Sequence, residues 1–187
     1  MATRHRVTVT FPMVTTREDV DWARERLGEA AARGGHRGIP PGLGVGIMAE
    51  VPAVALRADR VAEGLDVLSI GSNDLSQYTL AAERGNPRVA PWSDPLDPSV
   101  LQLIRQVCDR APEGVVVSLC GEMAADPDVA ALLVGLGVRE ISSTAASVPT
   151  VKARLRAATL TQLQELATAA EACGGAAEVR ALLDRSV

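Results

Sequence analysis

The chain has 187 residues, of which 47% are hydrophobic, and a formal net charge of −4. That size suits one globular domain with a sizeable core, and the acidic balance offers no basic face for nucleic acid. No apolar run approaches the roughly 20 residues that span a bilayer. The three cysteines lack metal-ligand spacing, and their odd number disfavours a disulfide framework. We therefore expect a cytoplasmic protein that neither enters a membrane nor binds nucleic acid.

The first half of the chain alternates short β-branched runs with longer helical patterns. A hydroxyl before an acidic turn predicts a helix start at Thr16, and Gly34-Gly35 predicts its end. In chain order we predict a strand at 7–11, a helix to about 33, a strand at 44–49, a helix from Pro52 to about 63, and a strand at 66–70.

The second half continues the same alternation after a loop rich in Pro and Asp. Asp97 and Asp126 each precede a proline and are predicted to cap the helices that follow. In chain order we predict a helix at 98–110, a strand at 115–119, a helix from 127, a short strand at 140–143, and a helical remainder interrupted at Gly174-Gly175.

Five β-α repeats with continuous apolar strands indicate a parallel sheet that is buried on both faces. Two α/β architectures fit this pattern, a doubly wound open sheet and a (β/α)8 barrel. A full barrel needs about 250 residues and eight strands. If the fold is a barrel, roughly its first three β/α units are absent from this chain.

Polar, reactive side chains follow three of the predicted strands, namely Glu50, Asn73 with Asp74, and Cys120. The carboxyl ends of parallel strands share one edge in both candidate architectures, and ligands bind there. We therefore expect these residues to meet although they lie far apart in sequence.

Glu50 and Asp74 supply hard oxygen atoms of the kind that hold Mg²⁺, which commonly takes one or two protein carboxylates. Either carboxylate could instead cap the helix that follows it, and for Glu50 alone this structural reading is the better one. Placed together on neighbouring strand ends, the pair favours a metal site.

Arg84 and Cys120 complete the candidate site. A guanidinium binds phosphate or carboxylate through its forked donors, although a lone surface arginine is usually only solvated. Free cysteines are most often small buried hydrophobes. Cys120, however, ends a strand before Gly-Glu, where a thiol could deliver a proton as a general acid. Cys108 and Cys173 lie in helical patterns, and we expect them to be structural.

The run from Asp66 to Arg84, DVLSIGSNDLSQYTLAAER, resembles the signature of the PEP-utilizing enzymes. That family includes Enzyme I of the bacterial sugar phosphotransferase system, PEP synthase and pyruvate phosphate dikinase. FPM at 11–13, IMAEVP at 47–52 and LCGEMA at 119–124 stand in the family's order. The QYTL and RGN details are most similar to Enzyme I, and the resemblance covers residues 6–156.

The resemblance implies a TIM-type (β/α)8 barrel, here partial, that binds phosphoenolpyruvate (PEP) and Mg²⁺. It implies that Glu50 and Asp74 hold the metal and that Asn73 and Arg84 contact the PEP phosphate. It also implies that Cys120 protonates C3 of the enolate as pyruvate forms. We expect residues 1–187 to be one partial barrel domain, with a core at 6–156 and C-terminal helices at 157–187.

The sequence departs from the family in three respects. It lacks the Thr-Ser-His-Ala type motif that carries the phosphohistidine, it lacks the first barrel strands with their arginines, and Val51 replaces a usual threonine. We expect a truncated product, a fragment or half of a split enzyme, inactive on PEP alone. Because an incomplete barrel exposes sheet edges and apolar surface, we expect a homodimer or a companion chain with the phosphohistidine domain.

Two other functions stay open from the sequence. The chain could be a fragment of a PEP synthase or dikinase, although the QYTL and RGN details argue against this. It could also be a non-catalytic module that senses PEP or binds a partner. The missing strands favour a loss of catalytic activity, whereas the intact motif residues argue against it.

Overall fold

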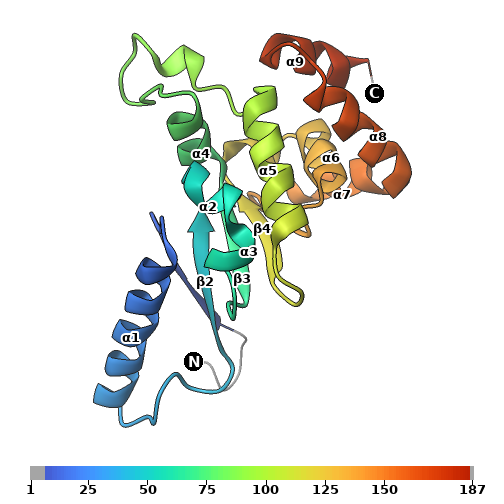
Figure 1. Ribbon diagram of the computed structural model, residues 1–187. Helices are drawn as coiled ribbons and strands as arrows, with labels where there is room; N and C mark the ends of the chain where they lie inside the picture. Colours follow the sequence, from blue (N-terminus) through green and yellow to red (C-terminus); the bar gives the residue numbers. More distant parts are fainter. Residues whose placement is uncertain (1–6, 186–187) are drawn as a thin grey trace.

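The computed structural model describes residues 7–185 and is built around one parallel sheet (Figure 1). All five predicted strands are present within about one residue of their expected bounds. They are β1 (Val7–Phe11), β2 (Leu43–Ala49), β3 (Val67–Gly71), β4 (Val116–Cys120) and β5 (Glu140–Ser142). Every neighbouring pair is parallel, and the strand order in space is β1-β2-β3-β4-β5. This order has no reversal of the kind that defines a doubly wound sheet.

A helix follows each strand; the helix at Ser72–Thr79 was not predicted, whereas the other helices lie in segments that were predicted to be helical. The helices are α1 (Arg17–Arg33), α2 (Pro52–Leu56), α3 (Ala58–Val61), α4 (Ser72–Thr79), α5 (Pro98–Arg110), α6 (Pro127–Leu136), α7 (Val148–Arg156), α8 (Leu160–Glu171) and α9 (Ala176–Asp184). Two 3-10 turns, η1 (Ala90–Trp92) and η2 (Glu122–Ala125), add to them. Within residues 7–185, no helix has the length and apolar character needed to cross a bilayer.

The three predicted caps are confirmed. Thr16 and Asp19 form a reciprocal capping box at the start of α1, and Asp19 also accepts from the amide of Thr15. These backbone hydrogen bonds lower the pKa of Asp19. Asp97 accepts from the amide of Ser99, and Asp126 accepts from two amides of α6. Each cap satisfies donors that the first helical turn leaves without partners.

The strands are buried on one face rather than two, which corrects the sequence-based expectation. Ile47, Leu68 and Leu119 point to the helix side and are fully buried. The register places Gly46, Met48, Ser69, Ser118 and Cys120 on the opposite side together with Val67 and Val116, and most of these residues are only partly buried. Short apolar runs hid this alternation because Gly, Ser and Cys do not contrast strongly with Val and Leu. The second face is therefore mixed in character and only partly covered.

Two further local differences concern helices. The single helix expected after Pro52 is broken into α2 and α3 at Arg57, whose φ of −128° is not helical. The Ser-Asn-Asp run, expected to extend from a strand end, instead forms the first turn of α4. Asn73 and Asp74 are therefore held by a helix that begins directly at the tip of β3.

Candidate functional site at the strand carboxyl ends

Glu50 follows β2 and is only 3% exposed. Its Oε1 accepts a hydrogen bond of 2.8 Å from the backbone amide of Met13, which lies just beyond β1. Helix α2 has Val51 as its N-cap, with no side-chain hydrogen bond. Glu50 therefore does not cap that helix, and the structural reading that the sequence favoured for it alone is wrong. A buried carboxylate needs a charged or hydrogen-bonding partner, and one amide satisfies only part of that need.

Gly71, the last residue of β3, makes room for this carboxylate. A Cβ built on Gly71 would lie 2.5 Å from Glu50 Oε2 and 2.9 Å from Met48 Cε. Real Cβ atoms do not approach other atoms so closely, so any side chain here would displace the Glu50 carboxylate. The glycine thus lets Glu50 reach from β2 to the tip of β3.

Asp74 lies in the first turn of α4, where its charge is favourable to the helix dipole. No side chain caps this helix, so the capping role considered for Asp74 is also wrong. Its Oδ1 instead lies 3.5 Å from Nη2 of Arg84. The Arg84 side chain is 55% exposed, so this pair is solvent-screened and contributes little to stability. Both charged groups can therefore exchange their partner for a ligand at small cost.

Gln77, one of the QYTL residues, fixes the position of Arg84. Its Oε1 accepts the Arg84 amide at 3.0 Å and so links the middle of α4 to the segment that follows it. Arg84 and Asn73 both line a pocket of about 330 Å³. The structure therefore brings the two residues predicted to contact phosphate to the wall of one cavity.

Cys120 is the last residue of β4 and is half-buried. Its Sγ accepts from Ser69 Oγ at 3.8 Å and donates to the Ile70 carbonyl at 3.6 Å, so two residues of β3 orient the thiol. Gly121, with φ of 135°, turns the chain away from the strand. A Cβ there would clash with Ser72 Oγ, which donates to the Cys120 carbonyl. Glycine is thus required for the close contact between the ends of β3 and β4.

Glu122 and Ser69 belong to the site although the sequence did not single them out. Glu122 lines the 330 Å³ pocket and also a wider one of about 550 Å³ that reaches the end of β5, and Asn73 lines both. The only sequence signal for Glu122 was its place in the LCGEMA motif. Ser69 gave none, because a serine inside an apolar strand does not reveal which face it occupies.

These contacts form a chain along the carboxyl edge of the sheet. Glu50 joins β1 to β3, Ser72 joins β3 to β4, and Asn73 faces the turn after Cys120. Glu50 is linked to the other predicted residues through Gly71, whereas Asp74 and Arg84 touch directly. In Figure 1 this edge lies toward the upper part of the molecule, where the arrow of β2 points and α4 begins.

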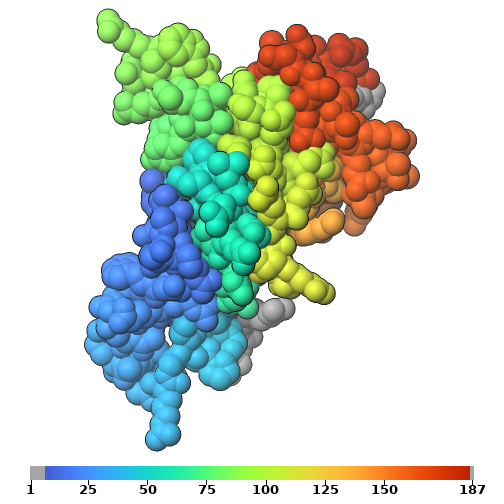
Figure 2. Space-filling model, in the orientation of Figure 1, coloured from blue at the N-terminus to red at the C-terminus, as the bar shows by residue number. Residues whose placement is uncertain are grey.

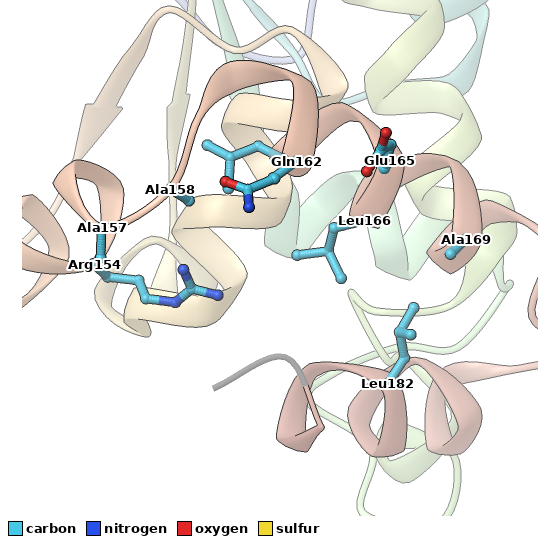
Figure 3. Close-up of a pocket in the computed structure, with 9 residues that line it drawn as sticks. Arg154, Ala157, Ala158, Gln162, Glu165, Leu166, Ala169 and Leu182 are labelled. Atoms are coloured by element: carbon cyan, nitrogen blue, oxygen red, sulfur yellow. The ribbon is translucent and has the colours of Figure 1, made fainter.

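Another pocket lies between α7, α8 and α9, away from the strand ends (Figure 3). Arg154 and Gln162 lie on one side of it, and Leu166 and Leu182 approach each other from α8 and α9. Arg154 is bonded to Asp128 of α6. None of the predicted site residues lines this cavity, so it is separate from the candidate site.

Comparison with known proteins shows which family the chain belongs to. The family model described as "PEP-utilising enzyme, PEP-binding domain" matches residues 1–160. The chain belongs to this family.

Several relatives extend over nearly all of the chain. A multiphosphoryl transfer protein of Xanthomonas campestris pv. campestris is 45% identical over 95% of this chain and 21% of its own length. A phosphoenolpyruvate-protein phosphotransferase of Haloferax volcanii is 42% identical over 95% of this chain and 32% of its own. A protein of the same name from Geobacillus stearothermophilus is 38% identical. The chain thus spans about a fifth to a third of the relatives it matches.

Proposed function

We propose that this chain is the PEP- and magnesium-binding portion of a phosphoenolpyruvate-protein phosphotransferase of the Enzyme I type. The observation that carries the proposal is the convergence of Asn73, Arg84 and Glu122 on one pocket, where Arg84 is also paired with the carboxylate of Asp74. The names of the relatives support the choice of reaction over that of a PEP synthase or dikinase. The five strands would then be the C-terminal part of a TIM-type barrel, in one partial domain over residues 1–187.

The donors present fit Mg²⁺ better than a transition metal. Within residues 7–185, no group of three or more His, Cys, Asp or Glu side chains is arranged to hold a metal ion. Mg²⁺ is commonly bound by one or two carboxylates and completed by water and phosphate oxygens, whereas zinc requires three or four protein ligands. Glu50 Oε2 is not used by the Met13 hydrogen bond, and Asp74 holds its arginine only loosely. These two residues would hold the metal.

Each residue then has a distinct task in the proposed reaction. Arg84 and the Asn73 amide would bind the phosphate, and their charge and donors would stabilise it as the phosphoryl group leaves the enol oxygen of PEP for a histidine outside this chain. Bound Mg²⁺ would supply compensation for negative charge on the substrate oxygens. Cys120 would give its thiol proton to C3 of the remaining enolate to form pyruvate, and water would return a proton to the thiolate.

Titration with PEP tests the proposal and separates it from a non-catalytic partner-binding module. We expect the purified chain to bind PEP in the presence of Mg²⁺ and to bind it at least about tenfold more weakly in EDTA, because phosphate and carboxylates repel without the cation. Isothermal titration calorimetry would measure both affinities. Absence of binding in either condition would favour the partner-binding module. Release of pyruvate by the chain alone would contradict the need for a histidine outside it.

The incomplete sheet suggests a partner. Strands β1 and β5 are the two edges of the described sheet, and Thr8, Glu140 and Ser142 on the open face are exposed. Unpaired edges favour association. We expect a homodimer or a complex with a companion chain that carries the phosphohistidine domain. A chain that sediments as a monomer at all concentrations and alone retains PEP binding would contradict this.

The three free cysteines favour a reducing compartment such as the cytoplasm.

A further inference from the structure

Residues 80–97 connect α4 to α5 and carry Arg84, yet they contain little regular structure. Their only helical turn is η1, and burial is concentrated at Ala82 and Leu96. Arg84 itself is fixed by the Gln77 hydrogen bond described above. The far end of the segment must be held by other contacts if the pocket wall is to keep its shape.

Helix α9 provides such a contact for the far end of the segment. Arg180 donates two parallel hydrogen bonds to Asp94, with Nη1 to Oδ2 at 2.6 Å and Nη2 to Oδ1 at 3.0 Å. This hydrogen bonding raises the pKa of Arg180. Asp94 Oδ1 also accepts the amide of Leu96 and so closes a tight turn. Figures 1 and 2 show the C-terminal helices beside the upper end of α5, next to this segment.

The bonded aspartate stands directly at the wall of the pocket. Ser93 and Pro95, its neighbours on either side, line the same 330 Å³ cavity as Asn73 and Arg84, whereas the Asp94 carboxylate is turned to α9. An unpaired carboxylate at this place would repel an incoming phosphate. Arg180 therefore does two things at once, because it anchors the wall and neutralises a negative charge beside an anion site.

We propose that Arg180 is a positioning residue for the anion pocket, acting through Asp94 on the wall formed by Ser93 and Pro95. The proposal rests on the proposed function, since it concerns the same pocket. It assigns a role to α9, which lies beyond the residues 1–160 that the family model matches. Exposed ion pairs usually contribute little to stability, so the effect should appear in the pocket rather than in the fold.

Three variants separate the effect of the position of the pocket wall from the effect of the Asp94 charge. Arg180→Gln removes the anchor and leaves Asp94 charged, Asp94→Asn removes the charge but keeps an acceptor for the Leu96 amide, and the double variant removes both. Hydrogen exchange of residues 80–97 reports position, and PEP titration with Mg²⁺ reports affinity. Glu171→Gln is the matched control, because Glu171 accepts from Arg105 at 2.7 Å and joins α8 to α5 away from the pocket.

We expect Arg180→Gln to speed exchange in residues 80–97 and to weaken PEP binding about 5- to 10-fold, the size expected when one like charge lies near the anion in a partly solvated site. The double variant should recover part of the affinity for PEP but none of the protection of residues 80–97 from hydrogen exchange. Glu171→Gln should change neither quantity. Unchanged exchange and affinity in Arg180→Gln would overturn the proposal. If Arg180→Gln exchanges faster but even the wild-type chain does not bind PEP, the anchoring role of Arg180 would be supported and the proposed function rejected.

Discussion

Replacing Glu50 by glutamine is expected to abolish the Mg²⁺-dependent part of PEP binding. Glutamine has nearly the same shape, and its carbonyl oxygen can still accept the Met13 amide that now bonds to Oε1 at 2.8 Å. What it loses is the negative charge at the buried position beside Gly71. Changes to residues that only support metal ligands cost about 10- to 100-fold in affinity, so loss of a ligand should cost at least as much. Calorimetric titration of Mg²⁺ and PEP would measure the effect.

A second variant tests the same carboxylate without replacing Glu50 itself. Gly71→Ala places a methyl group 2.5 Å from Glu50 Oε2, so it should displace the carboxylate and weaken metal-dependent binding as well. Gly85→Ala is a suitable control, since a Cβ there meets nothing closer than 3.6 Å. Thermal unfolding of each variant would distinguish a lost site from a lost fold. Full Mg²⁺-dependent affinity in Glu50→Gln would remove Glu50 from the metal site.

The sequence was sufficient for much of the fold because its signals are local. Strand bounds were marked by β-branched runs ending at Pro12, Glu50 or Gly121, and helix starts by Thr16, Asp97 and Asp126. These residues act on their own neighbours, so their effects can be read without knowing the tertiary structure. Helix α4 was missed because Ser72-Asn73-Asp74 favours turns when considered alone. Its helix is held by Leu75, which is fully buried.

The candidate site was predictable to the extent that parallel strands place their ends together. That rule predicted the edge, and the structure places Glu50, Asp74 and Cys120 there. It could not predict the partners of each group. The amide of Met13 follows β1 and the hydroxyl of Ser69 lies on β3, and only the packing of neighbouring strands brings them within reach of Glu50 and Cys120. Arg180 is more distant still, 86 residues from Asp94, and its helix carries no motif.

Replacing Cys120 by alanine is expected to stop pyruvate formation while leaving PEP binding nearly intact. The thiol is held by Ser69 and the Ile70 carbonyl rather than by any group that we propose to bind phosphate or metal. Its removal should therefore spare the Mg²⁺-dependent affinity. Proton transfer by a positioned group contributes about 10²- to 10⁴-fold to a rate, so pyruvate release should fall by that factor.

The measurement requires the part of the enzyme that supplies the histidine, for example the upstream portion of a phosphotransferase relative joined to this chain. Pyruvate would be followed by a coupled assay, and the affinity for PEP by calorimetry. Cys108→Ala is the matched control. Burial raises the pKa of Cys108 to about 12, so that thiol remains protonated and shielded among the residues of α5. Equal loss of activity in both variants would point to general damage. Unchanged pyruvate formation in Cys120→Ala would mean that another group, or water, protonates C3 of the enolate.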